Sequence, residues 1–101
     1  FPYTTLFRSL PMREAKYYFN QAEGYERDAE YYNNQAQKYL KDAEYYAGKG
    51  DLDKVATYQR WANDAIDKAK TRTRWAKDAR DKGKTRLEWA REALRKASNE
   101  N

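Results

Sequence analysis

The sequence predicts an all-α protein in which two long helices pair as an antiparallel two-helix coiled-coil hairpin. Three observations support this prediction: a repeat of fourteen residues, a heptad pattern of alanine and tyrosine, and one glycine-rich break near the middle of the chain. Fourteen residues are two heptads, and a heptad period keeps one face of each helix turned toward its partner in a left-handed supercoil. Charged residues make up 37% of the chain and proline is scarce, which is typical of long exposed helices.

The first predicted helix covers residues 12–47. Within it, alanine recurs at every seventh position, and a tyrosine follows three residues after each alanine. We assign the alanines to heptad position a and the tyrosines to position d, the two positions that form the seam of a coiled coil. The alanines are Ala15, Ala22, Ala29, Ala36 and Ala43, and the tyrosines are Tyr18, Tyr25, Tyr32, Tyr39 and Tyr46.

The break in the pattern covers residues 48–51 and reads Gly-Lys-Gly-Asp. We expect Gly48 to end the first helix in the left-handed conformation and Asp51 to cap the start of the second. A connection this short makes the two helices antiparallel neighbours.

The second predicted helix covers residues 52–97 and contains the sequence Trp-Ala-x-x-Ala three times. Its a positions hold mostly alanine. A register in which facing residue numbers add to about 101 sets each seam tyrosine against a small residue, such as Tyr32 against Ala69 and Tyr18 against Gly83. Arg72 and Arg86 fall at d, where we expect their stems to lie along the seam and their charges to point outward.

The first nine residues, Phe1 to Ser9, resemble the translation of a short-read sequencing adapter that contaminates metagenomic gene sequences. We therefore expect residues 1–11 to be an artefact and leader. Residues 12–101 are expected to form a single helical-hairpin domain.

The composition excludes several classes of function. The chain has no cysteine and no histidine, which removes disulfides, thiolate zinc sites and histidine acid–base catalysis. We expect no enzyme activity, no cofactor and no small-molecule substrate. No run of 18 apolar residues exists, so a membrane partner is not expected, and we predict a cytoplasmic location.

Two rows of aromatic residues lie just outside the predicted seam. Both rows repeat every fourteen residues and should climb the same flank of the hairpin. One interpretation is that these rings only widen the core of the hairpin. The other is that they form an interface, because exposed apolar strips mark association sites and Trp and Tyr are favoured interface anchors. The candidate interface residues are Trp61, Trp75 and Trp89 at position g, with Tyr17, Tyr31 and Tyr45 at position c.

The second half of the chain is strongly basic, within a net charge of +5 for the whole chain. A ladder of cations along a helix can follow a phosphate backbone. The alternative is a solvated face whose cations pair with acids four residues away, as in Asp64 with Lys68, Asp78 with Lys82 and Glu92 with Lys96. The candidate nucleic-acid contacts are Lys68, Lys70, Arg74, Lys77, Lys82, Lys84 and Arg91.

These observations favour a structural or protein-interaction module that forms a homo-oligomer or binds a protein partner. The alternative is a helical hairpin that binds nucleic acid without sequence specificity through the basic face of its second helix.

Overall fold

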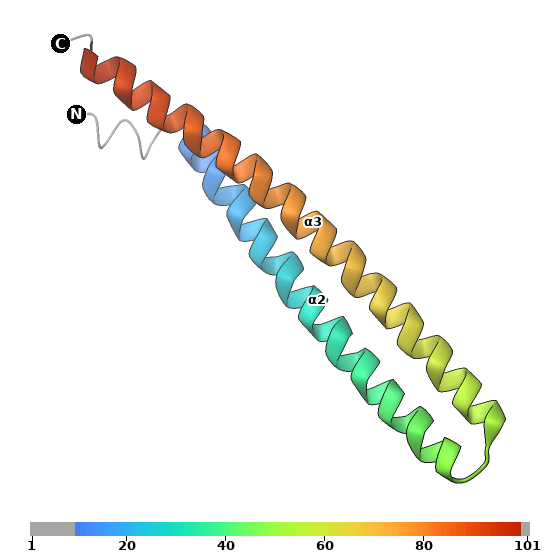
Figure 1. Ribbon diagram of the computed structural model, residues 1–101. Coiled ribbons are helices and arrows are strands. Elements are labelled where there is room, and N and C mark those ends of the chain that lie inside the picture. Colours follow the sequence, from blue (N-terminus) through green and yellow to red (C-terminus); the bar gives the residue numbers. More distant parts are fainter. Residues whose placement is uncertain (1–9, 100–101) are drawn as a thin grey trace. The chain divides into compact units, whose positions relative to one another are not determined.

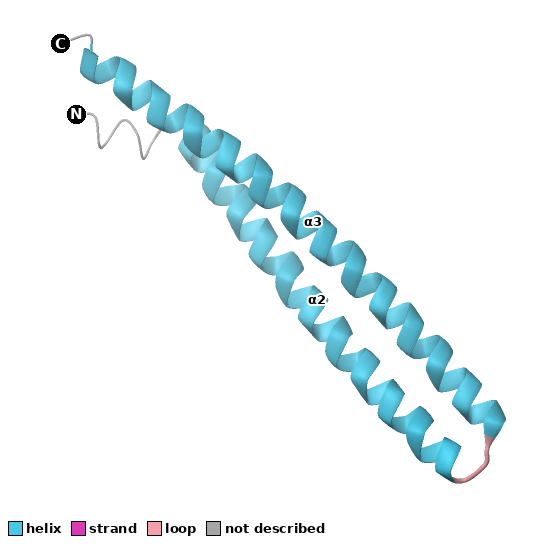
Figure 2. Ribbon diagram, viewed as in Figure 1, coloured by secondary structure: helices cyan, strands magenta, loops and turns pink. Residues whose placement is uncertain are grey.

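The computed structural model describes residues 10–99, which form helix α2 (Leu10–Gly48) and helix α3 (Leu52–Asn99) (Figure 1). Within this range every residue outside 49–51 is helical and none belongs to a strand (Figure 2). The predicted all-α fold of two antiparallel helices is therefore confirmed. Both helices extend up to two residues beyond the predicted bounds. The adapter-like segment 1–9 lies outside the described residues.

The contacts of the chain group into two compact units. The turn unit comprises residues 25–74, with the end of α2, the connecting turn and the start of α3. The terminal unit pairs residues 10–24 of α2 with residues 75–99 of α3. Within each unit, the two helices pack against each other through the predicted seam.

The core of both units is built from alanine. All five predicted a-position alanines of α2 are buried, and no large side chain is fully buried in the described range. The five seam tyrosines are only half-buried. Near the turn they do not all meet a small residue as predicted, because Tyr46 stacks on Tyr58 with 5.5 Å between ring centres and Tyr39 lies 6.4 Å from the same ring. On α3 the buried alanines are Ala62, Ala65, Ala69, Ala76, Ala79 and Ala90, and Gly83 is buried with them.

The turn between the helices differs from the prediction in one residue. Gly50, with φ of 75°, takes the left-handed conformation that was expected of Gly48. The amide of Gly50 donates to the carbonyl of Ala47 at 3.1 Å, and the amide of Asp51 donates to Tyr46 at 3.0 Å. These two bonds form a Schellman motif, which places its left-handed residue after the last helical turn rather than within it.

Asp51 caps the start of α3 as predicted. Its side-chain oxygen accepts a hydrogen bond from the amide of Lys54 at 3.2 Å. Asp51 thus contributes to the C-cap of α2 through its amide and to the N-cap of α3 through its carboxylate. This double role explains how three residues are enough to connect the two helices.

A charged layer crosses the seam of the turn unit at Tyr32. The Lys68 ammonium and the Arg72 guanidinium lie 5.6 and 5.7 Å from the centre of the Tyr32 ring. Arg72 also reaches Asp28, with 3.7 Å between nitrogen and oxygen. The facing residue numbers add to 100 or 104, so the predicted register holds, and the arginine sends its charge out of the seam as expected.

The terminal unit contains the same layer with every member fourteen residues away. Lys82 and Arg86 lie 5.7 and 5.8 Å from the centre of the Tyr18 ring. Arg86 donates a hydrogen bond to Glu14, and this bond raises the pKa of the guanidinium above its ordinary value. A tyrosine ring contacted by a lysine and an arginine, with an acid beside the arginine, is therefore a repeated structural element of this chain.

One contact of the terminal unit has no counterpart in the repeat. Phe19 lies against Gly83 so closely that a methyl group on the glycine would be 2.8 Å from Phe19 Cε1. Fourteen residues away, the phenylalanine is replaced by Asn33 and the glycine by Ala69. The large ring and the missing methyl group thus occur together.

Candidate interaction surface

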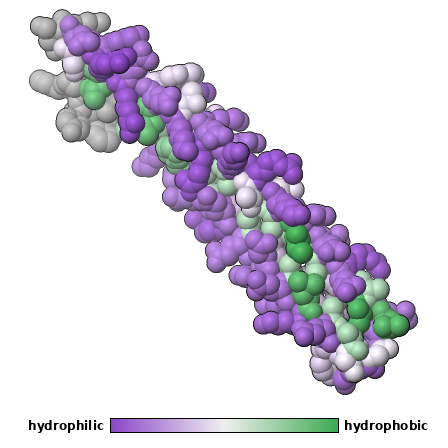
Figure 3. Space-filling view, in the orientation of Figure 1, coloured by the Kyte–Doolittle hydropathy of each residue, from purple (hydrophilic) through white to green (hydrophobic). Residues whose placement is uncertain are grey.

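The six predicted interface rings are all exposed. The tyrosines Tyr17, Tyr31 and Tyr45 expose 57, 58 and 57% of their surface, and the tryptophans Trp61, Trp75 and Trp89 expose 45, 41 and 52%. The visible surface is mostly hydrophilic, with small hydrophobic patches along it (Figure 3). Around each helix, position g lies next to the seam and position c one step further out, so the tyrosines at c are more exposed than the tryptophans at g.

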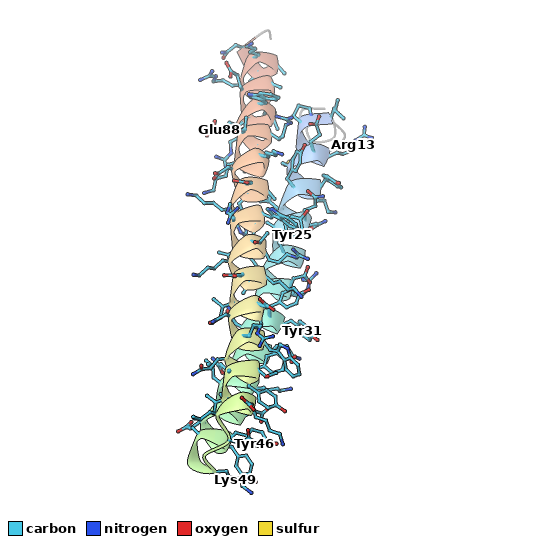
Figure 4. All side chains as sticks on the ribbon, turned by 90° about the vertical axis from the view of Figure 1, so that its right-hand side faces the viewer. Arg13, Tyr25, Tyr31, Tyr46, Lys49 and Glu88 are labelled. Atoms are coloured by element: carbon cyan, nitrogen blue, oxygen red, sulfur yellow. The ribbon has the colours of Figure 1, made fainter. Side chains whose placement is uncertain are left out.

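Each exposed tyrosine leans edge-on against the seam tyrosine that follows it. The ring centres are 5.4 Å apart for Tyr31 and Tyr32 and 5.1 Å apart for Tyr45 and Tyr46. Tyr31 projects from α2, whereas Tyr46 and Lys49 lie at the turn (Figure 4). The rings are thus held in place by the seam, as the core-widening interpretation expects, but more than half of their surface remains available to a partner.

In the turn unit, the rows from the two helices meet in a groove of about 400 Å³. Trp61 forms one wall, with its ring centre 5.6 Å from that of Tyr39 and 5.3 Å from that of Tyr58. Both Tyr31 and Trp61 line this groove, whereas Tyr45 does not. The lining residues are Tyr31, Tyr32, Gln35, Tyr39, Trp61, Asp64, Ala65 and Lys68.

Gln35 and Asp64 belong to the groove but were not among the predicted interface residues. Their heptad positions provide the signal that could have found them. Gln35 is at g of α2, and Asp64 is at c of α3, on the flank that carries the aromatic rows. Neither residue is aromatic, so the aromatic pattern alone does not indicate them.

The predicted ion pair between Asp64 and Lys68 is absent. Lys68 turns to the Tyr32 ring, and Asp64 has no ion-pair partner within residues 10–99. The other two predicted pairs are also wrong, because Lys82 lies over Tyr18 and Glu92 contacts Arg95 at 3.3 Å. An aromatic face attracts a cation as strongly as an exposed carboxylate four residues away does, so ring contacts take the place of the first two pairs.

The seven predicted nucleic-acid contacts divide into two groups. Lys68 and Lys82 are engaged with tyrosine rings on the aromatic flank. The other five are exposed and form no ion pair with any residue that the structure describes: Lys70 and Arg74 in the turn unit, and Lys77, Lys84 and Arg91 in the terminal unit.

Residues 10–99 contain no group of three or more acidic side chains that could hold a metal ion. Neither α2 nor α3 has an apolar stretch long enough to cross a lipid bilayer. Comparisons with known protein families, with curated proteins and with solved structures find no match to this chain.

Proposed function

We propose that this chain is a non-catalytic, cytoplasmic protein-interaction module that self-associates through its exposed aromatic flank. One observation carries the proposal. The interior consists of alanine, whereas six large aromatic side chains stand on the surface with about half of their area exposed. Exposed apolar patches of a few hundred square ångströms mark association sites, and Tyr and Trp dominate the energetics of such sites.

The exposed rings of the turn unit offer an area that is substantial relative to a protein–protein interface. A buried aromatic side chain covers roughly 150–250 Å², so the exposed halves of Tyr31, Tyr45 and Trp61 leave on the order of 300 Å² to cover. A standard interface buries about 800 Å² on each partner, and these three rings would supply more than a third of it.

A second copy of the chain is the partner that this flank fits best. Beside the rings, the flank carries acids such as Asp64 and cations such as Lys68. A surface with both signs of charge can be complementary to itself, which a two-fold dimer requires.

We expect sedimentation equilibrium to give a dimer for the unmodified chain at tens of micromolar. Changing Trp61, Trp75 and Trp89 together to Gln should give a monomer that remains helical by circular dichroism, because these rings lie outside the alanine core. The matched control changes the preceding f-position residues Arg60, Arg74 and Glu88 to Gln and should remain dimeric. A monomeric unmodified chain at 100 µM, or equal behaviour of the two triple variants, would contradict the proposal.

A second candidate function is binding of nucleic acid without sequence specificity. It is favoured by the five exposed basic residues of α3 that have no ion pair in the described range. Such side chains are available to phosphate groups at no cost in broken ion pairs.

Changing Lys70, Lys77, Lys84 and Arg91 together to Glu should abolish retention of single-stranded nucleic acid without unfolding the helices, because all four are exposed. In the unmodified chain, the affinity should fall steeply with salt, by up to about 0.7 logarithmic units per logarithmic unit of salt for each contact. Reversing Arg27 and Lys41 on α2 is the control and should change binding little. Retained binding in the quadruple variant would exclude the basic face of α3.

A further inference from the structure

Lys38 stands on the aromatic flank without a partner of its own. It occupies position c of α2, in the row of Tyr31 and Tyr45. Its side chain is exposed and forms no ion pair, hydrogen bond or ring contact with the residues that the structure describes. A single ammonium group among exposed aromatic side chains has the chemistry of a group that enters an aromatic groove on another molecule.

The groove at Trp61 offers the complementary chemistry. It combines the Trp61 ring with the Asp64 carboxylate, which has no ion-pair partner among residues 10–99. No cation of the described chain lies over the Trp61 ring, whereas Tyr32, Tyr45 and Tyr46 each carry at least one. Among aromatic side chains, tryptophan attracts a cation most strongly.

Lys38 and this groove lie at the same height in the turn unit. The charged layer at Tyr32 sets the register there, with facing residue numbers that add to 100 or 104. Lys38 is therefore level with about residues 62–66 of α3, beside Trp61 and Asp64. Within one chain the two groups occupy the outer rows of different helices, and they do not pair.

The symmetry of a dimer decides whether they can meet. A two-fold axis parallel to the helices places α2 of one copy over α3 of the other at unchanged height. A two-fold axis across the helices instead places like helices over each other, so that Lys38 of one copy faces α2 of the other and not Asp64. Only the parallel axis sets Lys38 against Asp64 at this level.

We propose that Lys38 of a second copy enters the groove at Trp61, with its ammonium group on the Asp64 carboxylate and over the indole ring. The contact occurs twice in a dimer whose axis runs parallel to the helices. This inference rests on the proposed self-association and adds to it the orientation of the copies and the group that fills the groove.

The fourteen-residue repeat supplies a matched control for this contact. Every groove residue recurs as the same amino acid one repeat away, with Asp78 in the place of Asp64 and Trp75 in the place of Trp61. The cation of the proposed contact does not recur, because the residue fourteen positions before Lys38 is Gly24. A change at Asp78 therefore tests the same local sequence without a matching cation.

The test is a charge swap followed by sedimentation equilibrium. Lys38→Glu and Asp64→Lys should each raise the dimer dissociation constant at least about tenfold, since close charge pairs across an interface couple strongly. The double variant should return to within about threefold of the unmodified chain, and Asp78→Lys alone should change the constant by less than threefold. Additive losses in the double variant, or an equal loss in Asp78→Lys, would overturn the inference.

A zero-length carbodiimide crosslink gives an independent readout, because it joins an ammonium group to a carboxylate only where the two touch. We expect mass spectrometry of the covalent dimer to show a peptide linking Lys38 to Asp64, and this peptide should disappear in Asp64→Asn. A linked dimer without this peptide would overturn the inference while the proposed self-association stands. A chain that remains monomeric would overturn both.

Discussion

Replacing Tyr32 with alanine should lower the free energy of unfolding by about 2 kcal/mol. Full truncation of a buried aromatic side chain costs about 3–5 kcal/mol, and Tyr32 is half-buried. The change also removes the ring over which Lys68 and Arg72 both lie, so these two cations lose that contact. Urea melts followed by circular dichroism at low micromolar concentration would measure the loss in the monomer.

The control for this change is the neighbouring tyrosine. Tyr31→Ala removes a ring of the same size that is 58% exposed, so its expected cost in the monomer is about 0.5 kcal/mol. Equal losses for the two variants would mean that position d does not face the seam.

Replacing Gly83 with alanine should destabilise the chain although alanine favours a helix. The exchange gains about 1 kcal/mol of helix propensity. It also places a methyl group 2.8 Å from the Phe19 ring, and overpacking of this kind costs about 1–3 kcal/mol. We expect a net loss of about 1 kcal/mol in a thermal or urea melt.

Gly83→Ala should change from destabilising to stabilising when the Phe19 ring is absent. In a Phe19→Asn background, which copies the residue found one repeat away, Gly83→Ala should stabilise the chain by about 1 kcal/mol. The double-mutant cycle then gives a coupling of about 2 kcal/mol between the two residues. A coupling near zero would show that the ring moves aside freely.

The seam was predictable because its signal is strictly periodic. Alanine at every seventh position can only be buried by a partner helix, and Ala15 to Ala43 are buried as the pattern predicts. The left-handed glycine was not predictable in the same way. Gly48 and Gly50 both suit that conformation, and the choice depends on how far α2 continues, which the heptad pattern does not specify.

The sequence located the aromatic rows but not the contacts of the charges beside them. Positions c and g lie outside the seam, which agrees with the exposure of the six rings, whereas their role as an interface stays a prediction. The partner of Lys68 does not follow from heptad position, because Asp64 and the Tyr32 ring are both within its reach and differ little in energy. That choice depends on where α2 places the ring across the seam, which is information about the fold and not about the local sequence.

The contact between Phe19 and Gly83 also affects which register of α2 against α3 is reached during folding. Because the repeats are nearly identical, a seam displaced by fourteen residues would still match alanine with tyrosine over much of its length, although residues 49–51 are too few to allow it without unwinding part of a helix. Such a slip would bring Phe19 to Ala69 in one direction or to Ala97 in the other, and each alanine has the methyl group for which Gly83 leaves space. The Phe19 ring therefore fits opposite Gly83 in the native register and would clash with an alanine methyl group in either displaced register.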